Sequence, residues 1–164
     1  MQESRIAALQ AMPIFGGLRS DVLAALLETS TTVTVPKDGF FFHEGDQAGS
    51  MFVLESGEVA VLKHWGGEEH RVGRLHQGDC FGEMALLDLF PRSASVRALE
   101  PCTAIELTTA SLYQLYETDL AQFALVQMNI ARELSRRLRA ADEQRFRARV
   151  GAAEPEPDYS FLVT

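Results

Sequence analysis

The sequence predicts an α+β fold: an antiparallel β jelly roll flanked by N-terminal helices and by one long C-terminal helix. Short apolar runs separated by turn residues fill residues 31–107, as is typical of strands in sandwiches and jelly rolls. On both sides of that zone, apolar residues recur every three or four positions, which is the period of an amphipathic helix. The length of 164 residues suits one domain, which we place at 1–149, followed by an acidic, disordered tail at 150–164.

Two short helices are expected before the strands. Ile6 and Leu9 mark the first helix, and Pro13 stops it because proline has no amide hydrogen to donate. Ser20 is a suitable N-cap for the second helix, over residues 21–29. The second helix carries one apolar stripe, made of Val22, Leu23, Leu26 and Leu27.

The strand zone is divided by glycine-containing turns. Apolar runs at 40–42, 51–54 and 59–62 alternate with these turns, mostly 8 to 12 residues apart. No helical period of useful length interrupts the zone before Phe81. This pattern indicates strands that pair in antiparallel fashion.

Residues 108–149 return to a helical pattern. Thr108 or Thr109 can cap a short helix, and Thr118 or Asp119 a long one. The long helix has an apolar stripe at helical intervals, made of Leu120, Phe123, Val126, Ile130, Leu134 and Leu138. We expect this stripe to dock on the barrel and the arginine-rich stretch 139–149 to stay exposed.

Composition and charge argue against several classes of function. The net charge of −8 does not suit a nucleic-acid binder, because neutralising phosphates requires an excess of Lys and Arg. Cys80 and Cys102 form no CxxC pair, and the four histidines lack metal-ligand spacing, so we expect no metal and no cofactor. No run of 18 apolar residues and no signal-peptide pattern occur, so we expect no membrane span and a cytoplasmic protein.

One segment, residues 81–96, carries a pattern with defined chemistry. Gly82 permits close approach of the backbone, and residues 83–87 can form one helical turn whose first amides are free to meet an anion. Arg92 offers a planar cation for a phosphate, and Glu83 offers an acceptor for a sugar hydroxyl. A lone Arg or Glu is usually a solvated surface residue, so the prediction of a phosphate and ribose pocket depends on their spacing and order.

This segment closely resembles the phosphate-binding cassette of cyclic nucleotide-binding domains, which occur in the protein kinase A regulatory subunit, cyclic-nucleotide-gated channels and the catabolite activator protein. The family pattern is Phe-Gly-Glu, an apolar turn, then Arg, a Ser, Thr or Ala, and Ala. Phe81-Gly82-Glu83 and Arg92-Ser93-Ala94 match it. The resemblance extends over residues 12–140. Asp38 stands where the family commonly has glycine, and aspartate tolerates the same left-handed turn.

The resemblance implies a role for each matching residue. Glu83 is expected to accept a hydrogen bond from the ribose 2′-hydroxyl, Arg92 to pair with the cyclic phosphate, and Ser93 to donate to that phosphate. Leu75, seven residues before the cassette glycine, stands where the family places an apolar residue under the base. The remaining phosphate contacts are expected from backbone amides, at Gly82, Met84, Ala85 and Ala94.

The same resemblance implies cAMP as the ligand, with cGMP as the less favoured alternative. Family members that prefer cGMP often carry Thr after the arginine, whereas this chain has Ser93. In the family, the helix after the barrel closes over the base. Arg132 and Arg136 are four residues apart on that helix and are candidates to stack on adenine; the alternative is that both are solvated.

We therefore expect a stand-alone cAMP receptor that signals to an unidentified protein partner through its C-terminal helix. No nucleophile–base constellation is evident, so no enzymatic activity is expected. About 25 residues follow Leu138, too few for a helix-turn-helix domain, so we expect no DNA binding, and a monomer or weak dimer. The alternatives are a regulatory domain of a larger channel, kinase or cyclase, a transcription factor-like relative lacking its DNA-binding domain, and a scaffold that has lost its ligand.

Overall fold

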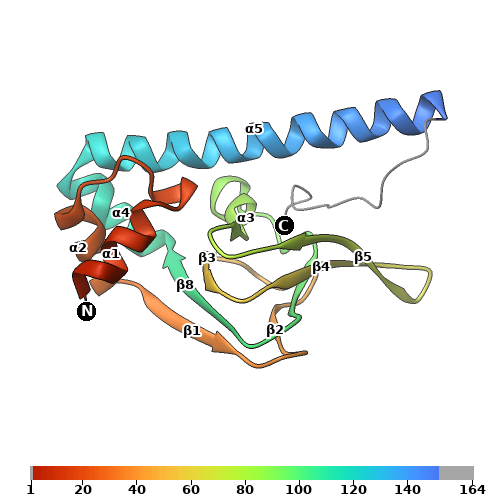
Figure 1. Cartoon of the computed structure of the whole chain (residues 1–164), viewed down its shortest axis with the longest axis horizontal. Coiled ribbons are helices and arrows are strands. Elements are labelled where there is room, and N and C mark those ends of the chain that lie inside the picture. Colours follow the sequence, from red (N-terminus) through yellow and green to blue (C-terminus); the bar gives the residue numbers. More distant parts are fainter. Residues whose placement is uncertain (1, 152–164) are drawn as a thin grey trace.

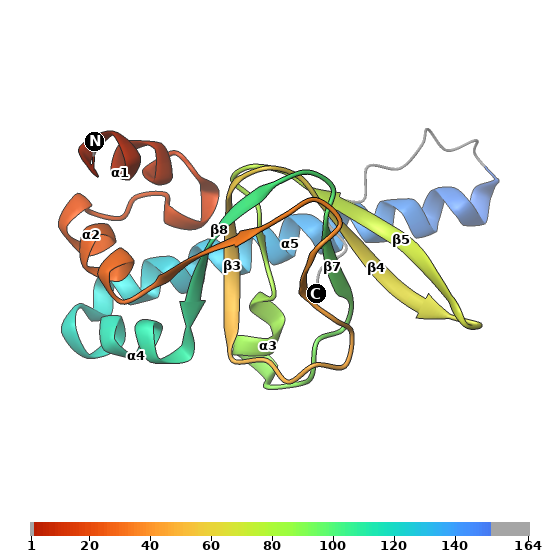
Figure 2. The same cartoon turned by 90° about the horizontal axis from the view of Figure 1, so that it is seen from below.

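Antiparallel strands form the centre of the molecule, and helices cover one end and one side of it (Figure 1, Figure 2). The computed structural model describes residues 2–151. The first elements are α1 (Gln2–Gln10), the short 3-10 helix η1 (Pro13–Phe15) and α2 (Ser20–Glu28). The strands are β1 (Thr31–Val35), β2 (Phe40–Phe42), β3 (Ser50–Ser56), β4 (Val59–Trp65), β5 (Glu68–Leu75), β6 (Cys80–Phe81), β7 (Ser95–Ala98) and β8 (Cys102–Thr108). The other helices are α3 (Glu83–Asp88), between β6 and β7, and α4 (Thr109–Thr118) and α5 (Leu120–Val150), after β8.

The strands form two four-stranded sheets that enclose a common core. Their orders are β1-β8-β3-β6 and β2-β7-β4-β5, and the paired strands are antiparallel. Consecutive strands such as β1 and β2 lie in different sheets, so the chain crosses between sheets as in a jelly roll. This arrangement confirms the predicted α+β jelly roll with flanking helices.

Strand β3 shows why the apolar core has two parts. Phe52 and Leu54 belong to the core between the sheets, whereas Met51 and Val53 belong to a second core beneath the helices. Side chains alternate between the two faces of a strand, so a strand buried on both faces requires a covering layer outside the sheet. The helices α1, η1, α2, α4 and α5 contribute to that layer.

Two helix caps and one turn form at the residues where the sequence predicts them. Thr108 caps α4, and its side chain accepts a hydrogen bond from the Ser111 amide at 3.1 Å. Asp119 caps α5 and accepts from the Gln122 amide at 3.1 Å. Asp38 has a φ of 68°, the left-handed turn expected of it.

The predicted cap of the second helix is wrong. Helix α2 begins at Ser20 itself, and Arg19 precedes it as an N-cap without a side-chain hydrogen bond to the helix. The Ser20 hydroxyl instead lies 3.2 Å from Nε2 of Gln10, from which it accepts a hydrogen bond. A tertiary contact with α1 therefore replaces the local cap.

The first half of α5 docks on the other helices. Val126 and Ile130 are buried in the helical core. The side-chain amide of Asn129 donates to the carbonyl oxygens of Ile14 at 3.1 Å and Gly16 at 2.9 Å. These two hydrogen bonds fix α5 against η1.

The expectation that the whole apolar stripe of α5 docks on the barrel is wrong at both ends. Leu120 is 59% exposed and Leu138 is 63% exposed, while Phe123 and Leu134 are only partly buried. Helix α5 has 31 residues, and its second half continues past α3 (Figure 1). The stretch 139–149 is mostly exposed, as expected.

The C-terminal boundary differs slightly from the prediction. Helix α5 continues through Val150 and ends at Gly151, which has a φ of 70°. The rest of the predicted disordered tail, 152–164, lies outside the described residues. Within 2–151, no helix is both long and apolar enough to cross a membrane.

Candidate functional site

The cassette, residues 81–96, runs from the end of β6 through α3 to the start of β7. Gly82 caps α3 and has a φ of 80°, a left-handed conformation that other residues adopt only at a cost. A Cβ atom at Gly82 would lie 2.5 Å from Nη1 of Arg92 and 3.3 Å from the Ser50 carbonyl oxygen. Glycine is therefore required twice here: for the turn, and for the close approach of the Arg92 guanidinium.

Arg92 is a buried cation beside this turn. Only 6% of the residue is exposed. Its Nη1 donates to the Gly82 carbonyl oxygen at 3.2 Å, and its Nη2 donates to the Ser50 hydroxyl at 3.4 Å. The guanidinium carbon lies 4.0 Å from the centre of the Phe42 ring, which is within cation–π distance.

The charge of Arg92 is incompletely compensated. Burial lowers the pKa of its guanidinium, whereas Glu106, Asp46 and Glu83 act to raise it. Among the described residues, its Nε has no hydrogen-bond partner. An open pocket of about 420 Å³ borders Arg92, and its polar lining includes Ser50, Asp46 and Glu106. The arrangement suits an anion that brings both charge and acceptor atoms.

Glu83, at the start of α3, is a buried carboxylate. It is 1% exposed, and its Oε1 accepts a hydrogen bond from Nη1 of Arg137 in α5. Its other oxygen, Oε2, has no hydrogen-bond partner among the described residues. Burial raises the pKa of Glu83 to about 7, while the charge of Arg137 acts to lower it. One oxygen of this carboxylate is thus paired, and the other is buried without a hydrogen-bond donor among the described residues.

Arg137 is a site residue that the sequence analysis did not identify. It is 3% exposed, and its Nη2 donates to the Cys80 carbonyl oxygen at 2.6 Å. Its Nε lies 3.3 Å from Oε1 of Glu133, one helical turn earlier. Burial acts to lower the pKa of Arg137, but nearby acidic groups, led by Glu83, raise it overall. Arg137 is seven residues after Ile130 and therefore lies on the same face of the helix. A charged residue on this otherwise apolar face was the feature of the sequence that could have identified it.

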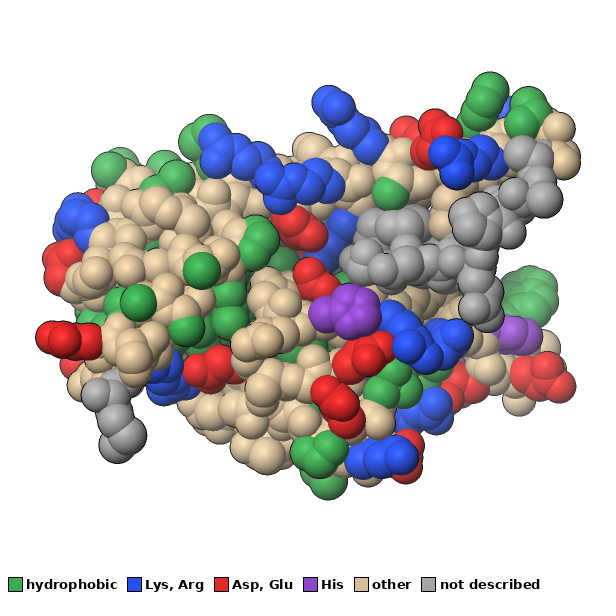
Figure 3. All heavy atoms as spheres, viewed as in Figure 1, with side chains coloured by type: hydrophobic (Ala, Val, Ile, Leu, Met, Phe, Trp, Pro, Cys, Tyr) green, Lys and Arg blue, Asp and Glu red, His purple; other side chains and the backbone are tan. Residues whose placement is uncertain are grey.

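The two arginines predicted to stack on the base lie on a different face of α5. Arg132 and Arg136 are exposed, and they hydrogen-bond to Asn129 at 3.4 Å and to Glu133 at 3.2 Å. At 3.6 residues per turn, they project about 140° and 100° away from Arg137. Figure 3 shows basic side chains, which in α5 are all arginines, along the outer surface of the helix. Their contact with a base stays a prediction.

The structure brings the core of the predicted site together. Arg92 contacts Gly82, and Glu83 follows Gly82 directly at the start of α3. Leu75 is fully buried in the core between the sheets, and its contact with a base is untested. The other predicted contacts are placed by the same short segment: Met84 and Ala85 in the first turn of α3, and Ser93 and Ala94 directly before β7.

Other features of the fold carry no comparable chemistry. Burial raises the pKa of the Cys80 thiol, which is 2% exposed, so this thiol is protonated and shielded. Within residues 2–151, no cluster of three or more His, Cys, Asp or Glu side chains could hold a metal ion.

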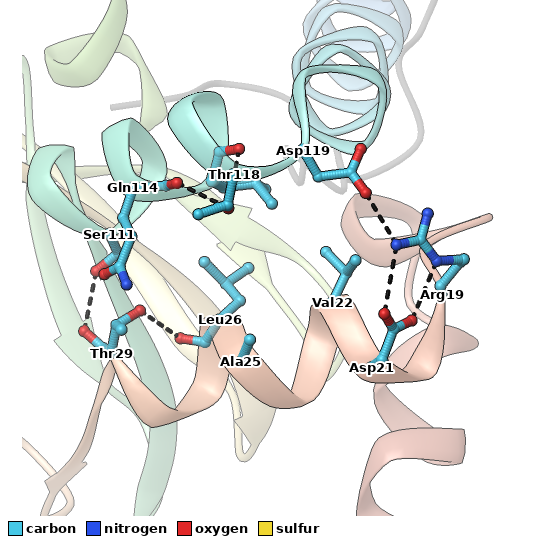
Figure 4. Close-up of a pocket in the computed structure, with 11 residues that line it drawn as sticks. Arg19, Asp21, Val22, Ala25, Leu26, Thr29, Ser111, Gln114, Thr118 and Asp119 are labelled. Carbon is cyan, nitrogen blue, oxygen red and sulfur yellow. Dashed lines mark hydrogen bonds and ion pairs between the residues drawn. The ribbon is translucent and has the colours of Figure 1, made fainter.

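A separate pocket of about 270 Å³ lies between α2 and α4 (Figure 4). Arg19 stands at one end, where its guanidinium contacts Asp21 at 3.1 Å and Asp119 at 2.9 Å. Because two carboxylates already neutralise this cation, the pocket is poorly suited to a phosphate. The cassette is therefore the better candidate for an anionic ligand.

Comparison with known proteins gives a consistent result. The family model described as cyclic nucleotide-binding domain matches residues 32–119, just over half of the chain. The cyclic AMP receptor protein of Thermus thermophilus is 33% identical over 135 residues, which are 82% of this chain and 61% of that protein. The cAMP-dependent protein kinase regulatory subunit of Emericella nidulans is 37% identical over 92 residues, which are 56% of this chain and 22% of that protein. The chain thus spans less than two thirds of the length of either relative.

The fold is also found in solved structures. A cyclic nucleotide-binding domain from Methylobacillus flagellatus superposes with a TM-score of 0.77 at 24% sequence identity. The match covers 87% of this chain and 81% of that one. At this level of identity, the likeness establishes the shared fold.

Proposed function

Because this chain belongs to the cyclic nucleotide-binding domain family, we propose that it is a cAMP receptor and that binding at the cassette is its function. One observation carries the proposal: Arg92 donates to the carbonyl oxygen of the left-handed Gly82, Glu83 follows Gly82 directly, and both charged residues are almost completely buried. Each also keeps a buried polar atom, Nε of Arg92 and Oε2 of Glu83, without a hydrogen-bond partner among the described residues. Such groups are costly to leave unpaired, so their presence supports a ligand that completes them.

A cyclic nucleotide fits the chemistry of these two groups. Its phosphate carries a negative charge and several acceptor oxygens, which suit the planar guanidinium of Arg92. Its ribose carries a 2′-hydroxyl, which can donate to a carboxylate oxygen of Glu83. Ser93 follows Arg92 directly and adds a hydroxyl on the same segment. The ligand would thus be held at the phosphate and at the sugar by one short stretch of chain.

Two arguments favour cAMP over cGMP. The relatives from Thermus thermophilus and Emericella nidulans are a cyclic AMP receptor protein and a cAMP-dependent kinase subunit by name. Ser93 stands where family members that prefer cGMP often carry threonine. We propose cGMP as the weaker ligand.

The output of the receptor is proposed to be α5. This helix contacts the cassette through Arg137, so a change at Glu83 acts directly on it. Its outer half, 139–149, is mostly exposed and rich in arginine, which suits an acidic protein partner. The receptor has no catalytic step in this proposal, and no catalytic family is indicated by the comparisons.

Isothermal titration with cAMP, cGMP and 5′-AMP tests the proposed function. Binding should be strongest with cAMP, weaker with cGMP and much weaker with 5′-AMP, whose phosphate is not cyclised onto the ribose. The absence of binding heat with both cyclic nucleotides, at ligand concentrations up to the high micromolar range, would overturn it.

A further inference from the structure

An apolar groove of about 580 Å³ lies between α3, α4 and α5, apart from the charged residues of the cassette. Leu87 of α3 and Tyr113 and Tyr116 of α4 line it, and each of these residues is about half exposed. The Tyr116 ring packs edge-on against Phe123 of α5, with 5.4 Å between the ring centres. No charged side chain among the described residues lines the groove. A continuous exposed apolar surface of this kind marks a place where another surface docks.

The apolar surface continues from the groove along α5. Ile130, which also lines the groove, is followed at steps of four residues by Leu134 and Leu138. These side chains therefore extend the same side of the helix. Leu134 is partly buried, whereas Leu138 is 63% exposed. The apolar track thus becomes more exposed toward the end of α5.

Cations follow the apolar track on this side of the helix. Arg145 and Arg149 come seven and eleven residues after Leu138, which places them within about 20° of its direction around the helix axis. Both arginines are exposed. Asp142 projects about 40° away from Leu138, and the two arginines outweigh its charge. From the end of α5 inward, this side of the helix is therefore first cationic and then apolar.

The sequence beyond α5 has the complementary order. The helix ends at Gly151, whose φ of 70° is the left-handed conformation that commonly ends a helix. Residues 152–164 lie outside the described residues. In their sequence, three acids alternate with two prolines, which favour an extended chain, and apolar residues follow. The acids are Glu154, Glu156 and Asp158, and the apolar residues are Tyr159, Phe161, Leu162 and Val163.

The lengths of the two segments match as well. Measured back from Gly151 along the helix axis, Arg145 lies at about 9 Å and Ile130 at about 31 Å, because the helix rises 1.5 Å per residue. An extended chain spans about 3.3 Å per residue. At that rise, Glu154 reaches about 10 Å and Phe161 about 33 Å from Gly151. The acids can therefore lie level with the arginines while the apolar residues lie level with the groove.

We propose that residues 154–163 fold back along α5 and dock on it, with their acidic part beside Arg145 and Arg149. Their apolar part then covers Leu138 and Leu134 and enters the groove between α3, α4 and α5. Because the segment is tethered to the helix that it covers, its effective concentration at the groove is high. The docked segment shields arginines that we propose for a protein partner. That consequence rests on the proposed function, whereas the docking itself does not.

A nitroxide label on Ser160→Cys tests the docked position, because the label broadens the amide signals of residues close to it. Cys80 and Cys102 are 2% and 1% exposed, so the label attaches to the introduced thiol. In the full chain, amide signals should be lost from three segments, and reduction of the nitroxide should restore them. The segments are 86–87 in α3, 113–116 in α4 and 127–138 in α5.

Charge reversal tests the order of the contacts. Arg145→Glu combined with Arg149→Glu should repel the acidic part, so the lost amide signals should return. Adding Glu154→Arg and Glu156→Arg to this labelled variant should abolish the signals again, because the charges are then opposite once more. Arg139→Glu is the matched control, since Arg139 is exposed and projects about 100° away from Leu138. It should leave the signals lost.

Several results would overturn the inference. Amide signals that persist in all three segments, or that are lost only elsewhere, would show that the groove has another occupant. Loss that appears only when a labelled chain is mixed with an isotope-enriched, unlabelled chain would mean that the segment enters the groove of a second copy. Signals indifferent to both charge reversals would exclude the pairing with α5. No nucleotide takes part in this test, so a chain that binds no cyclic nucleotide would overturn the proposed function alone.

Discussion

Glu83 at the start of α3 and Arg137 in α5 form a buried ion pair across 54 residues of sequence. The pair connects the most characteristic part of the barrel with the longest helix of the chain. Since breaking a buried pair leaves an uncompensated charge, the two elements are expected to move together. This relationship gives the proposed receptor a physical path from ligand to output.

Gly82→Ala tests the close approach between the turn and Arg92. The left-handed φ of 80° should destabilise the variant by roughly 1–2 kcal/mol, and the new Cβ should displace the guanidinium. Gly67→Ala is the matched control, because Gly67 has a φ of 81° and no atom within 4 Å of the added Cβ. Chemical denaturation should show a similar loss of stability from backbone strain in both variants, while titration shows a loss of cAMP affinity only in Gly82→Ala. Equal affinities in the two variants would contradict this account of the turn.

The free energy of unfolding should depend on pH through Glu83. Burial raises the pKa of Glu83 to about 7 in the folded chain, above its ordinary value of 4.5. Between these values, the folded chain holds a proton that the unfolded chain has released, so stability falls as pH rises through this window and levels off above it. Glu83→Gln cannot ionise and should lack this component. The stability of the unmodified chain minus that of Glu83→Gln should decline by up to roughly 3 kcal/mol from pH 4.5 to pH 8. A difference that stays constant or increases would show that Glu83 is ionised throughout this range.

Asn129→Ala should loosen α5 from η1. The substitution leaves the carbonyl oxygens of Ile14 and Gly16 without their side-chain donor, which should cost roughly 1–3 kcal/mol. Met128→Ala, at the adjacent and half-exposed position, should change stability by about 0.5 kcal/mol or less. Thermal or chemical denaturation of the two variants measures the difference. Equal stabilities would mean that α5 is held by apolar packing alone.

Addition of cAMP should slow amide hydrogen exchange in two separate segments. One is the first part of the cassette, 82–88, and the other is 133–138 in α5, which the ion pair joins to it. The outer stretch 143–149 makes no comparable contact and should exchange at an unchanged rate. Protection confined to the cassette would place the output of the receptor elsewhere than in α5.

The cassette could be predicted because its signals are local. Gly82, Glu83 and Arg92 lie within eleven residues, and their spacing defines one turn with a cation folded back on it. The surroundings of Arg92 could not be predicted in the same way. Ser50 and Phe42 reach it from other strands, and the strand pairing that brings them there is set by the whole sheet.

Arg137 does not belong to the apolar stripe from which the buried face of α5 was predicted, because a charged residue does not count toward such a stripe. The apolar stripe was continued from Leu134 to Leu138, four residues on, yet Leu138 is 63% exposed. Two turns of helix span about 7.2 residues, so Arg137, seven residues after Ile130, lies closer to the centre of the buried face. Its partners Glu83 and Cys80 are more than 50 residues away in sequence, and helical periodicity carries no information about such a contact.

Titration of cAMP into Arg92→Ala and into the matched control Arg145→Ala tests the central claim most directly. Arg145 is an exposed arginine in the outer half of α5, so it controls for the loss of one positive charge. Arg92→Ala should weaken cAMP binding by about 10- to 100-fold, the range for a hydrogen bond between charged groups, while Arg145→Ala should bind as the unmodified chain does. If Arg92→Ala bound cAMP as tightly as the unmodified chain, the cassette would not be the nucleotide site.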